Sequence, residues 1–147
     1  MSGYKGNTFQ SDLLKLIFQA TGIANLADNT ASSPLTNLYV ALHTADPGAG
    51  GTQSTNEVTY TGYARVAVAR TSGGWTISGS SPTQVVPAAT IVFPAGTGGS
   101  GTATNWSVGV ASSGATKILY SGPISPTIVT GNGITPELTT ASTVTED

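Results

Sequence analysis

The sequence contains no cysteine among its 147 residues, which excludes disulfide bonds and thiolate metal sites. Charged residues make up only 8%, against roughly 25% in average soluble domains. Histidine occurs once, at His43, and the carboxylates lack the spacing of a common metal-ligand set. We therefore expect no metal and no cofactor, although a loop calcium site using Asp46 or Glu57 with backbone carbonyls stays open.

Positive charge and long apolar runs are also scarce. The net charge is −2 and the pI is about 5.1, which argues against a nucleic-acid partner bound through phosphate neutralisation. Arg65 and Arg70 are five residues apart, so on one strand they point to opposite faces and form no basic stripe. No apolar run approaches the roughly 18 residues that cross a membrane. The first twelve residues, MSGYKGNTFQSD, lack a secretion-signal pattern, so we expect no Sec-type export.

Small polar residues are abundant in this sequence, in which charged residues are scarce. The chain has 19 glycines and is rich in threonine and serine, so uncharged groups must supply most of the surface. Such a surface packs against another protein without desolvating ions. The composition therefore favours a protein that contacts other proteins, with a secreted or merely robust β protein as the alternative.

Periodicity predicts the structural elements. Residues 1–10 are expected to form an extended arm, followed by a short amphipathic helix that Ser11 caps and that ends near Thr21-Gly22. The apolar, β-branched stretches Leu38–His43 and Tyr63–Arg70 predict two central strands, with a flexible loop at Gly48–Thr55 between them.

Short strands are expected to recur along the rest of the chain. The predicted segments are Trp75–Ile77, Val85-Val86, Ile91–Phe93, Trp106–Val110, Lys117–Tyr120, Ile128-Val129 and part of Ile134–Asp147. Ser113-Gly114 and Asn132-Gly133 predict turns, and the prolines should lie at strand edges or ends. This pattern predicts a single, mainly β domain over residues 1–147, an antiparallel β-sandwich or small jelly-roll-like barrel with one N-terminal helix.

No motif indicates catalysis. His43 and Asp46 could act as base and orienting group beside a serine, but His43 ends an apolar strand and no GxSxG occurs, so a structural histidine is favoured. Gly96–Gly101 matches GxGxxG but precedes a strand rather than a helix, which favours a flexible hairpin loop. Asn105-Trp106-Ser107 is a chance match to a glycosylation acceptor.

Aromatic side chains could form a platform for sugar. The candidates are Trp75, Trp106, Tyr39, Tyr60 and Tyr63. Trp106 alternates with two valines, as a core residue does, whereas Tyr60 and Tyr63 flank Gly62 and are predicted to be the more exposed pair.

Several segments together resemble a family of small tailed-bacteriophage and prophage proteins, described as capsid cement (decoration) or tail-fibre-like proteins. These segments are SDLLKLIF, NLYVALHTADPG, NEVTYTGYARVAVAR, GGWTISG, TNWSVGVASSGATKILYSG and the final TED. The resemblance covers nearly the whole chain and brings no catalytic residues.

The resemblance implies a virion structural protein made in the bacterial cytoplasm. It implies a cement subunit on the capsid exterior, a homotrimer that binds the major capsid protein and stabilises the shell, with no enzyme activity and no nucleic-acid or membrane partner. The alternative is a tail-tip or fibre module that binds host-surface glycan. The arm and the loop after the first central strand are expected to make the partner contacts, together with the tyrosine pair. The expected contact residues are Met1, Tyr4, Lys5, Asp46, Pro47, Gly48, Tyr60 and Tyr63.

Overall fold

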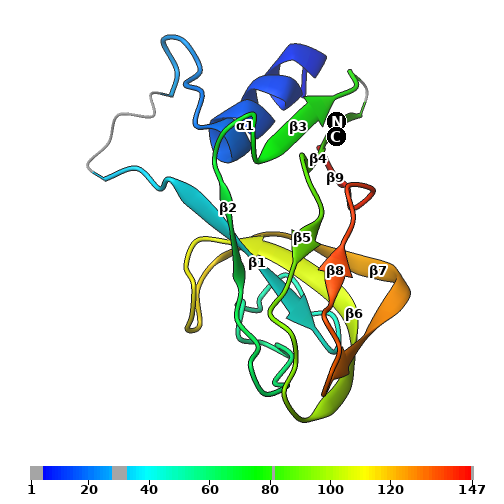
Figure 1. The fold of residues 1–147 in the computed structure, drawn as a ribbon. Coiled ribbons are helices and arrows are strands. Elements are labelled where there is room, and N and C mark those ends of the chain that lie inside the picture. The colour runs from blue at the N-terminus through cyan, green and yellow to red at the C-terminus, as the bar shows by residue number, and fades with distance from the viewer. Residues whose placement is uncertain (1–4, 28–32, 81, 147) are drawn as a thin grey trace. The chain divides into compact units, whose positions relative to one another are not determined.

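The structure is a computed structural model that describes residues 5–27, 33–80 and 82–146. It contains one helix, α1, and the strands β1 to β9 (Figure 1). The prediction of a mainly β fold with one N-terminal helix is confirmed. Within the described residues the sheets are open, so the barrel alternative is not observed.

The chain divides into two compact units, each assembled from separate segments. The first unit comprises residues 1–36, 69–89 and 139–147, and the second comprises residues 37–68 and 90–138. The chain passes from one unit to the other four times, so no single linker divides it. That residues 1–147 act as one domain stays a prediction.

The first unit places α1 on a three-stranded antiparallel sheet in the order β3-β4-β9. The helix spans Asn7–Gln19, and the strands are Trp75–Ser78, Thr83–Pro87 and Val144–Glu146. Leu14 and Phe18 are fully buried, and the ring of Phe18 meets Trp75 edge-on at 4.8 Å between centroids. This apolar face, with residues spaced four apart, fixes the helix on the sheet.

The N-terminal end of α1 differs from the sequence prediction. Gly6, not Ser11, is the N-cap, and the Gly6 carbonyl accepts a hydrogen bond from Gln10 N. The buried Gln10 side chain, whose Nε2 donates to Lys5 O, holds this extra first turn. The predicted arm over residues 1–10 is therefore wrong for 7–10, and residues 1–4 lie outside the described part. The helix ends at Ala20, with φ +53°, close to the predicted stop.

Arg70 closes the C-terminal end of α1. Its guanidinium donates from Nε to Ile17 O at 2.7 Å, from Nη2 to Leu16 O at 2.6 Å and from Nη1 to Leu35 O at 2.6 Å. The last carbonyls of a helix have no partner within the helix and carry partial negative charge. Arg70 satisfies two of them and also ties the helix to Leu35.

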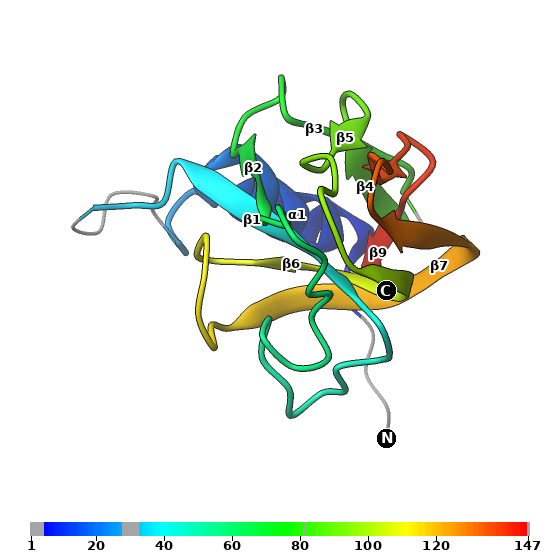
Figure 2. The same ribbon diagram turned by 60° about the horizontal axis from the view of Figure 1, so that its bottom comes forward.

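The second unit is built on a four-stranded sheet in the order β2-β1-β6-β7 (Figure 1). Its strands are Val66–Ala69, Asn37–His43, Ser100–Gly109 and Ile118–Gly131. Figure 2 shows β6 and β7 side by side as a long hairpin, and β1 pairs antiparallel with β6. Strands β5 (Ile91–Val92) and β8 (Glu137–Leu138) form a separate antiparallel pair.

The two faces of this sheet carry different chemistry. On one face Val40 lies opposite Val108 and Leu42 opposite Trp106, and all four are buried. On the other face the neighbouring register positions include His43 and Ser107. The predicted apolar core of the first central strand, and of Trp106, is therefore confirmed, and the second face is polar although it is buried.

Two strands differ from the prediction for identifiable reasons. The strand predicted over Tyr63–Arg70 is only Val66–Ala69, because residues 56–58 occupy the adjacent edge of β1: Thr44 N donates to Asn56 O and Val58 N to Leu42 O. Lys117–Tyr120 and Ile128-Val129 were predicted as separate strands, but Lys117 lies just before β7, and residues 118–120 and 128–129 belong to this one 14-residue strand. Its position at the sheet edge tolerates proline within the strand.

Candidate functional site

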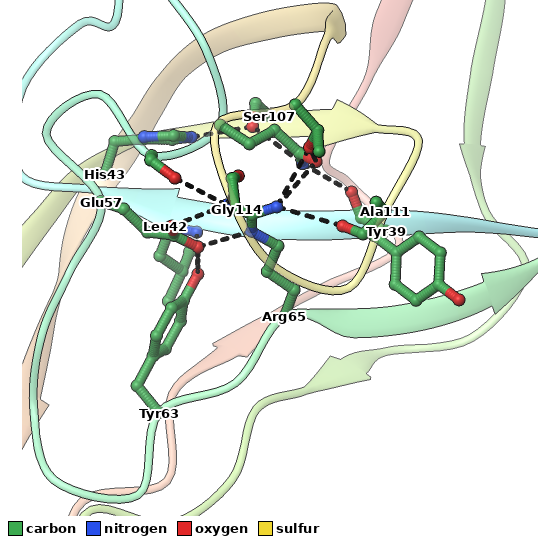
Figure 3. Close-up of polar contacts among 12 residues, drawn as sticks. Tyr39, Leu42, His43, Glu57, Tyr63, Arg65, Ser107, Ala111 and Gly114 are labelled. Carbon is green, nitrogen blue, oxygen red and sulfur yellow. Dashed lines mark hydrogen bonds and ion pairs between the residues drawn. The ribbon is translucent and has the colours of Figure 1, made fainter.

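His43 stands at the end of β1 with its side chain fully buried. Nδ1 lies 2.8 Å from Thr55 O. Nε2 lies 2.8 Å from Ser107 Oγ (Figure 3). Asp46 does not orient the ring, since its Oδ1 accepts from Gly48 N at 2.9 Å in an exposed turn. The prediction that His43 is hydrogen-bonded at a strand end is confirmed.

Arg65 lies beside this histidine and is the centre of the polar cluster. Its Nε donates to Glu57 Oε1 at 2.7 Å and its Nη2 to Glu57 Oε2 at 2.8 Å, a bidentate pair. The Arg65 side chain is 2% exposed and that of Glu57 is 17% exposed. Burial of a charge is costly unless the charge is paired and hydrogen-bonded, and this geometry supplies both conditions.

The remaining guanidinium hydrogens of Arg65 reach the hairpin turn between β6 and β7. Nη2 donates to Gly114 O at 2.8 Å, and Nη1 donates to Ala111 O at 3.1 Å and Thr116 Oγ1 at 3.2 Å (Figure 3). One side chain therefore joins the turn at residues 110–117 to the loop at residues 44–57, which carries Glu57.

Gln53 fastens the same loop onto the polar face of the sheet. It is fully buried, with Nε2 donating to Tyr39 O at 2.9 Å and Oε1 accepting from Thr116 Oγ1 at 3.1 Å. Gly109 makes room for it, because a Cβ at this position would lie 2.1 Å from Gln53 Cδ. The loop at residues 48–55, predicted to be flexible, is therefore packed on the sheet through Gln53.

Tyr63 completes the cluster at the edge of β1. Its hydroxyl donates to Glu57 Oε1 at 3.0 Å and accepts from Leu42 N at 3.1 Å. The hydroxyl oxygen thus takes the place of the backbone carbonyl that a neighbouring strand would offer to Leu42 N. Burial raises the pKa of the Tyr63 hydroxyl, which stays a neutral donor. We call this set the Arg65 network; it comprises His43, Gln53, Glu57, Tyr63, Arg65, Ser107 and Thr116.

The expectation that Tyr60 and Tyr63 are exposed is wrong. Tyr60 is 5% exposed and donates from its hydroxyl to Pro94 O at 2.7 Å, while Tyr63 is half-buried. The two rings meet edge-on at 5.4 Å, and Tyr63 stacks on Phe93 at 6.3 Å. The loop between β1 and β2 folds these rings inward, where hydrogen bonds satisfy their hydroxyls.

The other predicted contact residues lie in different environments. Asp46 and Gly48 are exposed, and Pro47 between them is buried. Lys5 pairs with Glu146, which joins the two ends of the described chain within the first unit. Met1 and Tyr4 lie outside the described residues. That these residues contact a partner protein stays a prediction.

The remaining sequence motifs have structural roles. The GxGxxG match at residues 96–101 runs into a strand and not a helix, as predicted, since β6 begins at Ser100. Backbone bonds such as Gly96 N to Ile134 O at 2.8 Å hold the residues before it. Across residues 5–27, 33–80 and 82–146, no three His, Cys, Asp or Glu side chains gather as a metal site requires. In the same part of the chain no helix is long and apolar enough to cross a membrane.

The chemistry that the Arg65 network could perform is limited by its burial. Ser107 lies at hydrogen-bond distance from His43, as a nucleophile lies beside its base, but both residues are fully buried. A substrate cannot reach a hydroxyl without exposed surface. The arrangement holds two loops on a sheet.

Sequence reasoning named Glu57 only as a possible calcium ligand, and it missed Gln53 and the pairing of Arg65 with Glu57. Their partners are eight to 63 residues apart in sequence, so no local spacing reveals them. The scarcity of charge was the available signal: with five cations in the chain, an arginine inside an otherwise apolar strand segment indicates a dedicated partner.

Residues 17–144 match the protein family described as podophage GP4 fiber I protein gp80. A comparison with curated proteins finds no match to this chain. The family match covers both compact units and confirms the resemblance to tailed-phage virion proteins. The chain therefore belongs to this family of podophage fibre proteins, which are structural components of the virion.

Proposed function

We propose that the protein is a non-catalytic structural subunit of a phage tail fibre that acts through contacts with other proteins. The observation that carries this proposal is the Arg65 network. The only histidine of the chain and the bidentate Arg65–Glu57 pair are both used inside the second unit to fix loops. The fibre description of the matching family supports the tail location.

Contacts between proteins fit this surface better than recognition of sugar by an aromatic platform. Trp75, Trp106 and Tyr60 are buried in their own units, and stacking on sugar needs an exposed ring face. The surface is instead poor in charge and rich in small polar side chains, so it can enter an interface with little ion desolvation. We expect self-association, with a homotrimer as the leading form.

Capsid decoration is the second candidate. The sequence has no repeat of fixed period, and each compact unit is assembled from segments distant in sequence. This organisation suits a compact block better than a repeating fibre shaft. In that role the partner is the major capsid protein, and the protein lies on the capsid exterior.

Copy number in purified virions distinguishes the two candidates. Quantitative mass spectrometry would compare peptides of this protein with those of the major capsid protein in the same particles. A fibre subunit is expected at a small number of copies per particle, whereas a decoration protein is expected at numbers close to those of the capsid protein. Absence from purified virions would reject both.

The exposed turn at Asp46 is the first place to look for the contact. Asp46→Ala removes an exposed charge and a turn hydrogen bond to Gly48 N, so incorporation into particles should fall while the fold persists. Glu137→Ala, which also removes an exposed carboxylate, is the matched control and should incorporate normally. Equal incorporation of both variants would remove this turn from the interface.

A further inference from the structure

Asn132 and Gly133 form an exposed turn directly after β7. Ile134 N donates to Gly131 O at 3.1 Å and closes this turn. Gly133 has a φ of +74°, a conformation that residues with a Cβ rarely adopt, so the turn calls for glycine at this position. The fold thus places a glycine immediately after an exposed asparagine.

A glycine in this position makes the preceding asparagine side chain reactive in water. The main-chain nitrogen of the glycine gives up its proton and attacks the side-chain carbonyl carbon, and no Cβ hinders its approach. The new C–N bond closes a succinimide ring, while the bond to the side-chain amide nitrogen breaks and ammonia leaves with the proton. Water then opens the ring to aspartate or to isoaspartate. Here the attacking atom is Gly133 N and the carbon attacked is Asn132 Cγ.

The folded chain holds the attacking nitrogen in a hydrogen bond. Gly133 N donates to Gly96 O at 2.8 Å, so its proton is bound and its peptide plane is fixed. Two further backbone bonds join the same segments, from Gly96 N to Ile134 O at 2.8 Å and from Asn132 N to Gly99 O at 3.2 Å. The attack on Asn132 therefore requires this part of the fold to open first.

We propose that Asn132 is a latent site of spontaneous deamidation, kept unreactive by the backbone bonds that join residues 96–99 to residues 131–134. The proposal gives the glycine-rich segment before β6 a role. A Cβ at Gly96 would clash with Gly131 O, so glycine is what lets this segment approach the turn closely enough to bond it. This inference does not depend on the fibre assignment.

The reaction would change the turn permanently. In isoaspartate the main chain runs through the former side chain and gains one carbon atom between Gly131 and Gly133. Gly131 is buried, and its carbonyl accepts the bond from Ile134 N that closes the turn. The longer main chain cannot keep both Gly131 and Ile134 in place. Chains in which the turn opens are therefore altered irreversibly, while chains that stay folded remain intact.

The rate of deamidation at Asn132 tests the proposal. Peptide mapping by mass spectrometry would follow the formation of aspartate and isoaspartate in the folded protein and in the same chain unfolded in guanidinium chloride, at one mildly alkaline pH. We expect the folded protein to react at least about tenfold more slowly, which corresponds to an opening free energy of about 1.4 kcal/mol or more. Amide exchange at Gly133 N should be slowed to the same degree. Equal rates in the folded and unfolded chains would overturn the proposal.

A pair of variants separates local opening from unfolding of the whole second unit. Gly99→Ala should accelerate the reaction in the folded protein, because it places a Cβ at φ +79° and 3.3 Å from Tyr60 Cα. Gly48→Ala is the matched control in the same unit, since it also places a Cβ at positive φ, +70°, but meets nothing within 4 Å. It should leave the rate at Asn132 unchanged. Equal acceleration by both variants would overturn the proposal, and the exchange of Gly133 N in the unchanged protein decides if Gly99→Ala does not fold.

Discussion

Glu57 receives its two shortest hydrogen bonds from Arg65, Nε to Oε1 at 2.7 Å and Nη2 to Oε2 at 2.8 Å. The same Arg65 side chain also donates to Gly114 O. Glu57 and Arg65 lie in the loop before β2, and Gly114 lies in the turn between β6 and β7. The Arg65–Glu57 pair therefore joins two loops and is not a surface ion pair. Its loss should lower the free energy of unfolding.

Arg65→Met should lower the free energy of unfolding by about 3–5 kcal/mol, because it leaves the Glu57 carboxylate without its buried partner. Urea unfolding measures this change. Lys117→Ala, which removes one exposed positive charge, is the matched control and should change stability by less than about 0.5 kcal/mol. Combining Arg65→Met with Glu57→Leu should cost less than the two single changes added together. Full additivity would show that the pair is not coupled.

Gly109→Ala should be destabilising by about 1–3 kcal/mol, because the new Cβ would lie 2.1 Å from Gln53 Cδ and Oε1. Gly50→Ala meets nothing within 4 Å and provides the control for the loss of glycine. Adding Gln53→Ala to Gly109→Ala should cancel the steric part of the cost in thermal or urea unfolding. If the double variant loses as much stability as the two single variants added together, Gln53 does not occupy the space above Gly109.

Tyr63→Phe should cost about 1–3 kcal/mol, since the amide of Leu42 loses its acceptor at the buried edge of β1. Tyr39→Phe is the matched control because the Tyr39 hydroxyl points away from the Arg65 network (Figure 3). Amide exchange at Leu42 N should become faster in the first variant alone. Unchanged exchange there would mean that the tyrosine hydroxyl does not complete the strand edge.

Arg70→Ala should destabilise the first unit by about 1–2 kcal/mol, because two carbonyls at the end of α1 lose a charged donor. Lys15→Ala, on the same helix, controls for the removal of a positive charge. Helix content by circular dichroism and exchange at Thr21 N should report the change. Equal effects of the two variants would contradict a capping role for Arg70.

The sequence predicts those elements whose burial follows from local pattern. The helix, with Leu14 and Phe18 four apart, and the first central strand, Leu38–His43, are examples, because one buried face needs only the right period. The turn at Ser113-Gly114 was also predictable, since Gly114 adopts φ +83°.

The features that differ from prediction depend on position in the fold. Pro123 and Pro126 argue against a strand interior, yet β7 runs through both because it lies at the sheet edge. Tyr60 looked exposed beside Gly62, but it is buried with Pro94 O as its partner, 34 residues away. The Arg65 network is likewise assembled from the loop, β1, β6 and the β6–β7 turn, so no window of sequence contains it.

The location of the protein in the particle tests the central claim most directly. Cryo-electron microscopy of purified virions, with an antibody fragment bound to this protein, would show which structure carries it. The account predicts label on the tail fibres and none inside the particle. Label absent from every external structure, with the protein recovered only from the soluble fraction of the lysate, would contradict a virion structural role.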